Sequence, residues 1–304
     1  MQQEKFTLVS NADGLILHGL LVAPDNDIQG VIQILHGMCE FKERYQEFIE
    51  FFCAHGFVVV CHDQRGHGDS LREERDLGYF YETKAQAIVQ DAAQVTEWIK
   101  QRYPDLPITL FGHSMGSMVA RCYLQEHDTL VDKAIICGSP AKNPLVNIAI
   151  GLTKTIALFR GERHRCKTLS YLSTGKGNKQ FPGEGKGAWL SNNRANITAF
   201  YSNPKGNKRF TCNGFENLFR LMKKTYSPKL YKVQNPTLPI HFVSGSEDPV
   251  LGGAKNFDKT IAFMQNVGYT NVSGKLYQGL RHEIHNEIEN AEVLSDLLAQ
   301  MQTK

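Results

Sequence analysis

The stretch that decides the fold runs Ile108-Thr-Leu-Phe-Gly-His-Ser-Met-Gly116. Its first four residues are apolar or β-branched and predict a short buried strand. Beyond the stretch, apolar side chains at 118, 119, 122 and 123 share one face of a helix. The pentapeptide at 112–116 therefore lies in a sharp turn from strand to helix. A Gly-x-Ser-x-Gly pentapeptide in that setting is typical of a nucleophilic serine, and Ser114 is the candidate.

The residue types of this turn have a physical reason. Ser114 has to adopt strained backbone angles, which lift its hydroxyl clear of the sheet. A side chain at Gly112 or Gly116 would clash with the neighbouring backbone. The amide of Met115 stands at the start of the helix and points toward negative charge that develops beside the serine. Met115 is therefore the first candidate oxyanion donor.

Outward from this turn, strands and helices alternate along the chain. This alternation predicts an α/β fold with a mostly parallel sheet and helices on both faces. The first two strands, joined by the turn at 11–14, form a hairpin. The expected strands are 6–10, 15–21, 30–35, 57–61, 108–111, 133–137, 238–244 and 272–277. The expected helices are 45–53, 85–102, a helix from 114, 257–267 and 291–301.

The alternation stops between residues 140 and 233, which are rich in Gly, Asn, Lys and Arg. We interpret this segment as an inserted cap subdomain, and residues 1–139 and 234–304 as the core. Because the insert lies between consecutive strands of one sheet, it should cover the carboxyl edge of that sheet, where ligands bind in open α/β folds.

Charge is distributed unevenly along the chain, although the net charge is only +3. Residues 142–229 carry 17 Lys and Arg against three acidic residues, a net of +14. The rest of the chain carries 17 against 28, a net of −11. A basic insert on an acidic body indicates either a solvated surface or attraction to anionic lipid headgroups or an anionic substrate.

A serine hydroxyl needs a base, and the base needs an orienting carboxylate. With a nucleophilic serine in such a strand-to-helix turn, the expected order along the chain is serine, then acid, then histidine. His282 comes directly after the last expected strand and is the predicted base. His285, one helical turn further, is expected on the surface. The other histidines after Ser114 lie in a strand, at a helix end or in the insert; they are His241, His127 and His164.

The acid is expected directly after the penultimate strand, in Ser244-Gly-Ser-Glu-Asp248-Pro249. Glu247 and Asp248 both qualify by position, and we take Asp248 because Pro249 suits a tight turn that presents one side chain inward. Asp132 and Asp63 are weaker candidates. A second oxyanion donor should come from the turn after Leu35, where the Met38 amide is the candidate.

Several classes of protein are disfavoured. The first residues lack the pattern of a signal peptide, no apolar run could span a membrane, and the seven scattered cysteines suit a reducing cytoplasm. No phosphate-binding loop or zinc spacing is present, so we expect no cofactor and no metal. No nucleic-acid recognition motif is visible, and the oligomeric state is left open.

With these residues placed, the sequence resembles the α/β-hydrolase superfamily. Within it, the chain is similar to the monoacylglycerol lipase and lysophospholipase group, the serine aminopeptidase S33-like hydrolases. The resemblance implies Ser114 as nucleophile, Asp248 as acid, His282 as base and the amides of Met38 and Met115 as oxyanion donors. It also implies that Arg65 and His67 brace the sheet edge. The motifs that carry it are 35–38, 63–70, 112–116, 245–248 and 281–287.

Two functions follow from this pattern. The first is a serine hydrolase that cleaves a carboxylic ester of a monoacyl lipid, a monoacylglycerol or lysophospholipid, through an acyl-enzyme. The second keeps the chemistry and changes the substrate, to that of a short-chain carboxylesterase, thioesterase or peptidase with an anionic substrate. A non-catalytic binding protein on the same scaffold is a remote third alternative, since no member of the triad is missing.

Overall fold

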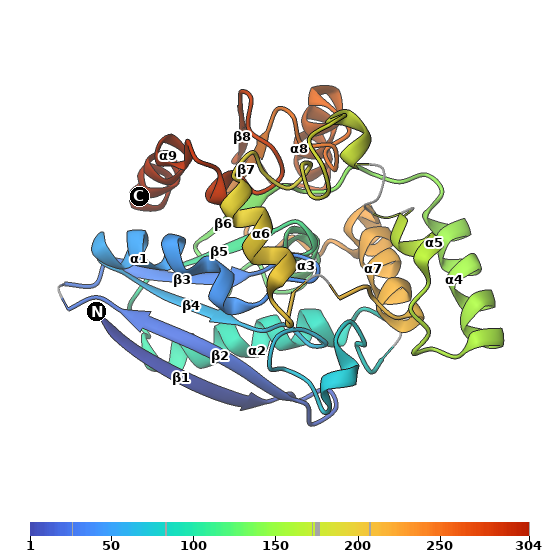
Figure 1. The fold of residues 1–304 in the computed structure, drawn as a ribbon. Helices are drawn as coiled ribbons and strands as arrows, with labels where there is room; N and C mark the ends of the chain where they lie inside the picture. The colour runs from blue at the N-terminus through green and yellow to red at the C-terminus, as the bar shows by residue number, and fades with distance from the viewer. Residues whose placement is uncertain (26, 83, 172, 174–176, 207, 304) are drawn as a thin grey trace.

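A single eight-stranded sheet forms the centre of the molecule in the computed structural model, which describes residues 1–304 except 26, 83, 172, 174–176, 207 and 304 (Figure 1). The strand order is β1-β2-β4-β3-β5-β6-β7-β8. The pairs β1–β2 and β2–β4 are antiparallel, and every later pair is parallel. The α/β fold with a mostly parallel sheet is therefore confirmed.

The strands lie close to their expected places. β1 begins at Gln2 rather than Phe6, because its hairpin partner pairs with it as far as Ala23 opposite Gln2. The strands are β1 Gln2–Val9, β2 Ile16–Ala23, β3 Gly30–Leu35, β4 Phe57–His62, β5 Ile108–His113, β6 Lys133–Cys137, β7 Ile240–Gly245 and β8 Val272–Tyr277. β3 to β7 are buried along their whole length, which explains their continuous apolar sequences.

Helices cover both faces of the sheet and divide its core in two. On one face, α1 (Gln46–Ala54) and α9 (Asn290–Gln302) pack through residues such as Phe48 and Leu297. On the other face lie α2 (Ala87–Arg102), α3 (Met115–Tyr123) and α8 (Ala254–Asn266). The central strands β3 to β7 are thus shielded from water on both faces, as parallel strands require.

The segment between β6 and β7 folds into helices. They are α4 (Val146–Arg160), α5 (Lys167–Ser170), α6 (Arg194–Ser202) and α7 (Cys212–Thr225). Of these, α4, α5 and α7 lie together beyond one end of the sheet, and α6 lies apart from them, closer to the middle of the molecule (Figure 1). Asn193 and Thr211 cap α6 and α7 by accepting hydrogen bonds from backbone N–H groups of the first turn. α4 packs on α7, and α7 packs on α3 of the core.

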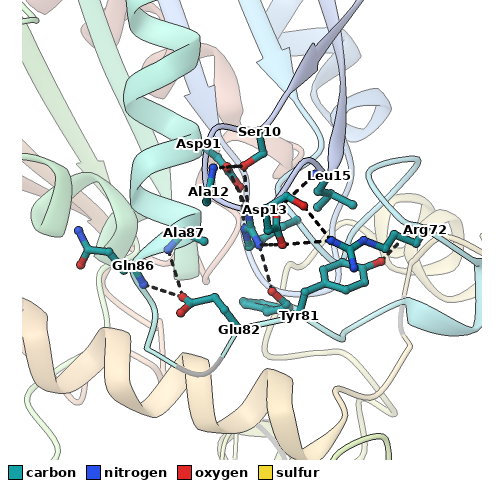
Figure 2. Close-up of polar contacts among 12 residues, drawn as sticks. Ser10, Ala12, Asp13, Leu15, Arg72, Tyr81, Glu82, Gln86, Ala87 and Asp91 are labelled. Atoms are coloured by element: carbon teal, nitrogen blue, oxygen red, sulfur yellow. Dashed lines mark hydrogen bonds and ion pairs between the residues drawn. The ribbon is translucent and has the colours of Figure 1, made fainter.

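A buried ion pair braces the loops that follow β1 and β4. Arg65 is fully buried, and its Nε donates to Asp91 Oδ2 at 2.7 Å. Asp91 also accepts from the Ser10 hydroxyl at 2.5 Å, and Arg65 reaches Asp13 at 3.1 Å. Figure 2 shows Ser10, Asp13 and Asp91 gathered beside the start of α2, with the exposed Arg72 at the edge of the cluster. These contacts tie Arg65 to the turn between β1 and β2 and to α2.

We expect Arg65→Met to lower the free energy of unfolding by about 3–5 kcal/mol, because it leaves the buried Asp91 carboxylate without its cation. Denaturant unfolding followed by circular dichroism measures the change. Arg72→Met is the matched control: this side chain also faces Asp13 but is 52% exposed, so its loss should cost less than about 1 kcal/mol. Equal effects of the two substitutions would contradict the bracing role of Arg65.

Candidate active site

Ser114 occupies the turn between β5 and α3. Its backbone angles, φ 52° and ψ −113°, are ones that residues other than glycine rarely adopt. The two glycines around it are needed for close packing. A Cβ on Gly112 would lie 2.5 Å from the carbonyl oxygen of Gly116, and one on Gly116 would overlap the carbonyl of Leu35. The turn is therefore tight enough to press the start of α3 against the end of β3.

Three side chains from separate loops meet at this turn. The Ser114 hydroxyl lies 2.8 Å from Nε2 of His282, and Nδ1 of His282 lies 2.8 Å from Asp248 Oδ2. Asp248 follows β7 and His282 follows β8, so all three residues stand at the carboxyl edge of the sheet. Their order along the chain is serine, acid, histidine.

Asp248 is held in one orientation by two further hydrogen bonds. Its Oδ2 accepts from the Ser244 hydroxyl at 3.0 Å, and its Oδ1 accepts from the Val250 N–H at 2.8 Å. Because both carboxylate oxygens are engaged and the residue is 3% exposed, the carboxylate cannot swing away from His282. The Trp189 ring lies 5.1 Å from the His282 ring and covers it from the side of the insert.

The other candidate acids lie elsewhere. Glu247 is exposed, and its carboxylate is 3.9 Å from Arg281 Nε. Asp132 accepts from the N–H of Ile108 at the opposite end of β5. Asp63 is buried against Lys42 Nζ at 2.6 Å. None of the three contacts His282 within the described chain.

The backbone amides of Met38 and Met115 flank Ser114 from the loop after β3 and from the start of α3. In the described part of the chain neither N–H has a hydrogen-bond partner, so both are free for an incoming acceptor. A Cβ on Gly37 would come within 3.1 Å of the Ser114 Cβ, which shows how closely the first loop approaches the serine. Sequence reasoning proposed both amides.

Glu40 holds the loop of Met38 in place, and sequence reasoning missed it. Its Oε2 accepts from the Gly37 N–H at 2.7 Å and from the Tyr45 hydroxyl at 2.8 Å. Its Oε1 lies 3.4 Å from Nδ1 of His113, within reach of an ion pair but longer than a well-aligned hydrogen bond. All these residues are buried.

Burial and neighbouring charges shift the pKa values of Glu40 and His113 in opposite directions. Burial alone would raise the pKa of Glu40, but His113 and Arg44 outweigh it and hold that pKa well below its ordinary value of 4.5. Burial alone would lower the pKa of His113, but the Glu40 carboxylate outweighs it and raises that pKa above 6.5. Glu40 and His113 therefore each favour the charged form of the other.

His285 is not on the surface as expected; it is 1% exposed. Its ring stacks on Tyr45 with centroids 5.2 Å apart and lies 4.8 Å from the ring of His113. Burial lowers the pKa of His285 well below 6.5, so the ring is neutral. The expectation was wrong because the turn after β8 packs inward onto α1, which local spacing could not show.

One group of potential metal ligands exists in the described chain. Donor atoms of His113, Cys137 and His285 all lie within 4.8 Å of one another. Burial raises the pKa of the Cys137 thiol well above 9.0, and His113 is already engaged by Glu40. The group offers three donors, one fewer than a closed structural zinc site, and none of the three residues lines the pocket, so we assign no metal to it.

Ser114 and His282 open into a pocket of about 700 Å³ between the core and the inserted helices. One part of its wall is apolar and comes mainly from α3 and α7, including Met118, Phe215, Leu218 and Phe219. Another part is cationic. It consists of Arg165, Lys167, Lys186, Lys208 and Arg209.

Two contacts join the rim of this pocket to the core. The thiol of Cys39, next to Met38, lies 2.9 Å from the carbonyl oxygen of Lys208. Lys205 Nζ lies 2.6 Å from Asp69, which also contacts Lys42 of the core at 2.7 Å. The segment before α7 is therefore tied to the loop that carries the Met38 amide.

This sheet order, with a serine in the turn after β5 and a histidine after β8, defines an α/β-hydrolase. The sequence of residues 26–289 matches the family model described as "Serine aminopeptidase, S33". The chain belongs to that family.

Relatives and solved structures agree with this assignment. The chain is 26% identical to monoglyceride lipase of Mus musculus, over 91% of its own length and 83% of that protein. It is 26% identical to a phospholipase of Bacillus subtilis, over 86% and 91% of the two chains. A carboxyl esterase from Bacillus coagulans superposes with a TM-score of 0.88 at 24% identity, covering 99% and 98% of the two chains. The chain is an ester hydrolase of the serine type.

We expect Glu40→Gln to lower the free energy of unfolding by about 1–3 kcal/mol, most strongly between pH 4.5 and 6.5. The lowered pKa of Glu40 gives stability that is present above 4.5 and is lost as the pH falls. The raised pKa of His113 gives stability that is present below 6.5 and is lost as the pH rises. Urea unfolding at a series of pH values measures the loss of stability at low pH and the loss at high pH.

The exposed Glu47 on α1 supplies the control for this experiment. Glu47→Gln removes the same charge without touching His113, so its difference from wild type should be small and flat between pH 4 and 8. A flat difference for Glu40→Gln as well would show that the two buried groups are not charged together.

Proposed function

We propose that the chain hydrolyses the ester bond of a monoacyl lipid, with Ser114 as nucleophile, His282 as base and Asp248 as acid. The observation that carries the proposal is the pair of 2.8 Å contacts that links these side chains beneath an apolar pocket wall. We also propose that residues 140–233 act as the cap over this site, on a core of residues 1–139 and 234–304.

The first half of the reaction acylates the serine. Nε2 of His282 takes the hydroxyl proton of Ser114 as Oγ attacks the ester carbonyl carbon. Asp248 accepts a hydrogen bond from Nδ1–H and stabilises the imidazolium that forms. The carbonyl oxygen becomes an oxyanion and accepts from the amides of Met38 and Met115. His282 then returns the proton to the leaving alcohol, and the acyl group stays on Ser114.

The second half removes the acyl group. A water molecule gives its proton to His282 and attacks the acyl carbon, so that the same two amides receive the oxyanion again. When the tetrahedral intermediate collapses, the bond to Ser114 Oγ breaks and His282 returns the proton to the serine. A fatty acid leaves, and the starting state is restored.

The apolar part of the pocket supports an acyl substrate. Met118, Phe215 and Phe219 present only carbon and sulfur surface, which favours an alkyl chain at about 0.8 kcal/mol per buried methylene. The relatives named as monoglyceride lipases support the same substrate class. A short-chain esterase remains the competing reading, and the two differ in how turnover depends on chain length.

Ser114→Ala should lower kcat for p-nitrophenyl acyl esters by about 10⁶-fold, and Asp248→Asn by about 10⁴-fold, as in other serine triads. Glu247→Gln is the matched control, since Glu247 is the adjacent carboxylate and faces solvent. Its activity should equal that of the wild type. Wild-type rates in Ser114→Ala would refute the proposal, and a rate maximum at acetate or butyrate would favour the short-chain esterase.

We further propose that α4 touches an anionic membrane from the cytoplasmic side. Apolar side chains stand exposed along this helix, with Leu158 at 80% and Phe159 at 78%. The exposed cations Lys142, Lys154 and Arg160 lie in the same stretch of chain. Apolar contact together with basic charge is what peripheral binding to anionic lipid requires.

Among the described residues no helix has both the length and the apolar composition needed to cross a bilayer. The cysteines support the placement on the cytoplasmic side. All seven cysteines are free thiols, which suits a reducing compartment.

Leu158→Ser/Phe159→Ser should weaken binding to vesicles of anionic phospholipid at least about tenfold, since two apolar side chains leave the interface. Hydrolysis of a soluble ester should not change. Ile288→Ser is the control, because Ile288 is 67% exposed but lies outside the inserted segment. Cosedimentation with vesicles measures the binding, and equal binding of both variants would exclude α4 as the contact.

A further inference from the structure

The cationic part of the pocket wall consists of Arg165, Lys167, Lys186, Lys208 and Arg209, which we call the cationic rim. Arg165 lies just before α5 and Lys167 is its first residue, Lys208 and Arg209 lie just before α7, and Lys186 lies in the loop before Trp189. The chain thus brings five positive charges to the opening of the pocket that contains Ser114. Their role is not explained by the ester chemistry.

The rim differs in its partners from the cations of the insert that form ion pairs. Arg163, Lys205 and Arg220 each form an ion pair with a carboxylate, as do Lys154 and Arg194. Within the described residues, no side chain of the cationic rim does so. Five cations of the insert that have no described carboxylate partner thus line the pocket together, while others, such as Lys223 and Lys229, lie away from it.

Arg165 illustrates the free-energy cost of a cation that has no carboxylate partner. It is half-buried, and it donates to the backbone carbonyls of Arg209 and Arg75 rather than to a carboxylate. Burial and the nearby guanidinium groups of Arg209 and Arg163 lower the pKa of Arg165. A partly desolvated guanidinium among like charges gains free energy when an anion arrives.

The remaining members of the rim are available to the same anion. Lys167, Lys208 and Arg209 are exposed, and Lys186 lies over the Tyr201 ring at 4.0 Å, an apolar platform that does not neutralise it. The carboxylates that line the pocket cannot neutralise the rim. Glu40 is buried against His113, and Glu283 is buried in a 2.7 Å ion pair with Arg44.

We propose that the cationic rim binds a phosphate group carried by the substrate, so that the preferred ester is a monoacyl lipid with an anionic phosphate headgroup. Two arginines and three lysines match the several oxygens and the double charge of a phosphate monoester. The acyl chain lies along the apolar wall of α3 and α7 while the headgroup stays at the rim. This inference rests on the proposed ester hydrolysis at Ser114 and narrows its substrate.

The test compares three esters that share one acyl chain and differ only in the headgroup. They are octanoyl glycerophosphate, octanoyl glycerophosphocholine and octanoyl glycerol, all used below their micelle concentrations so that lipid surfaces play no part. We expect kcat/KM for the glycerophosphate ester to exceed that for the phosphocholine ester by about tenfold or more, and to fall with added salt.

Lys208→Gln/Arg209→Gln should abolish most of this preference, because it should lower kcat/KM for the glycerophosphate ester much more than kcat/KM for octanoyl glycerol. Both side chains are exposed, and the contacts that their residues make to Cys39 and Arg165 use backbone carbonyls, so the fold is retained. Lys223→Gln/Lys229→Gln is the matched control. It removes two exposed lysines of the same insert that do not line the pocket, and it should keep the wild-type preference.

A second arm separates a headgroup site from a site for free phosphate. Glycerol phosphate should inhibit hydrolysis of p-nitrophenyl octanoate competitively, and less so in Lys208→Gln/Arg209→Gln. Inhibition by inorganic phosphate without any preference among the three esters would mean an adventitious anion site only, and would overturn the inference. Equal rates for all three esters would also overturn it. Failure to hydrolyse p-nitrophenyl octanoate would instead refute the proposed function itself.

Discussion

The arrangement of this site depends on one close approach, that of the Ser114 turn to the end of β3. Gly116 leaves no room between the start of α3 and the Leu35 carbonyl, and β3 and β5 are adjacent and parallel. The loops that leave these two strands must therefore emerge side by side. The close approach that accompanies the strained turn at Ser114 also brings the Met38 loop next to the serine hydroxyl. Packing of the turn and the geometry proposed for catalysis therefore depend on the same contact.

Much of this arrangement can be predicted from the sequence because it follows from order along a sheet. Once Ser114 is placed after one strand, parallel neighbours bring the loops that hold Asp248 and His282 to the same edge. Glu40 could not be found in this way. Its partner His113 is 73 positions away, and Glu40 itself stands in no recognisable pattern. The burial of His285 was missed for a related reason, since it depends on Tyr45 of a distant segment.

The insert is where sequence reasoning is weakest. Its basic character was plain, but basic composition does not separate cations that stabilise the fold from cations that await a ligand. That distinction depends on where the carboxylates of the core lie. Asp76 pairs with Arg163 and Asp69 pairs with Lys205, whereas no described carboxylate forms an ion pair with Arg165 or Lys208. The apolar exposure of α4 was equally hidden, because a helix with apolar residues on several sides gives no sign of which side is covered.

The bond between the Cys39 thiol and the Lys208 carbonyl has a mechanical consequence. It ties the segment before α7 to the loop that contains Met38. The Lys205–Asp69 ion pair ties the same segment to the core nearby. If the insert lifts to admit a bulky substrate, it has to break these links or pull the loop with it. Access to Ser114 is thus coupled to the position of the loop of Met38, whose amide we propose as an oxyanion donor. Opening the pocket would leave that loop less restrained.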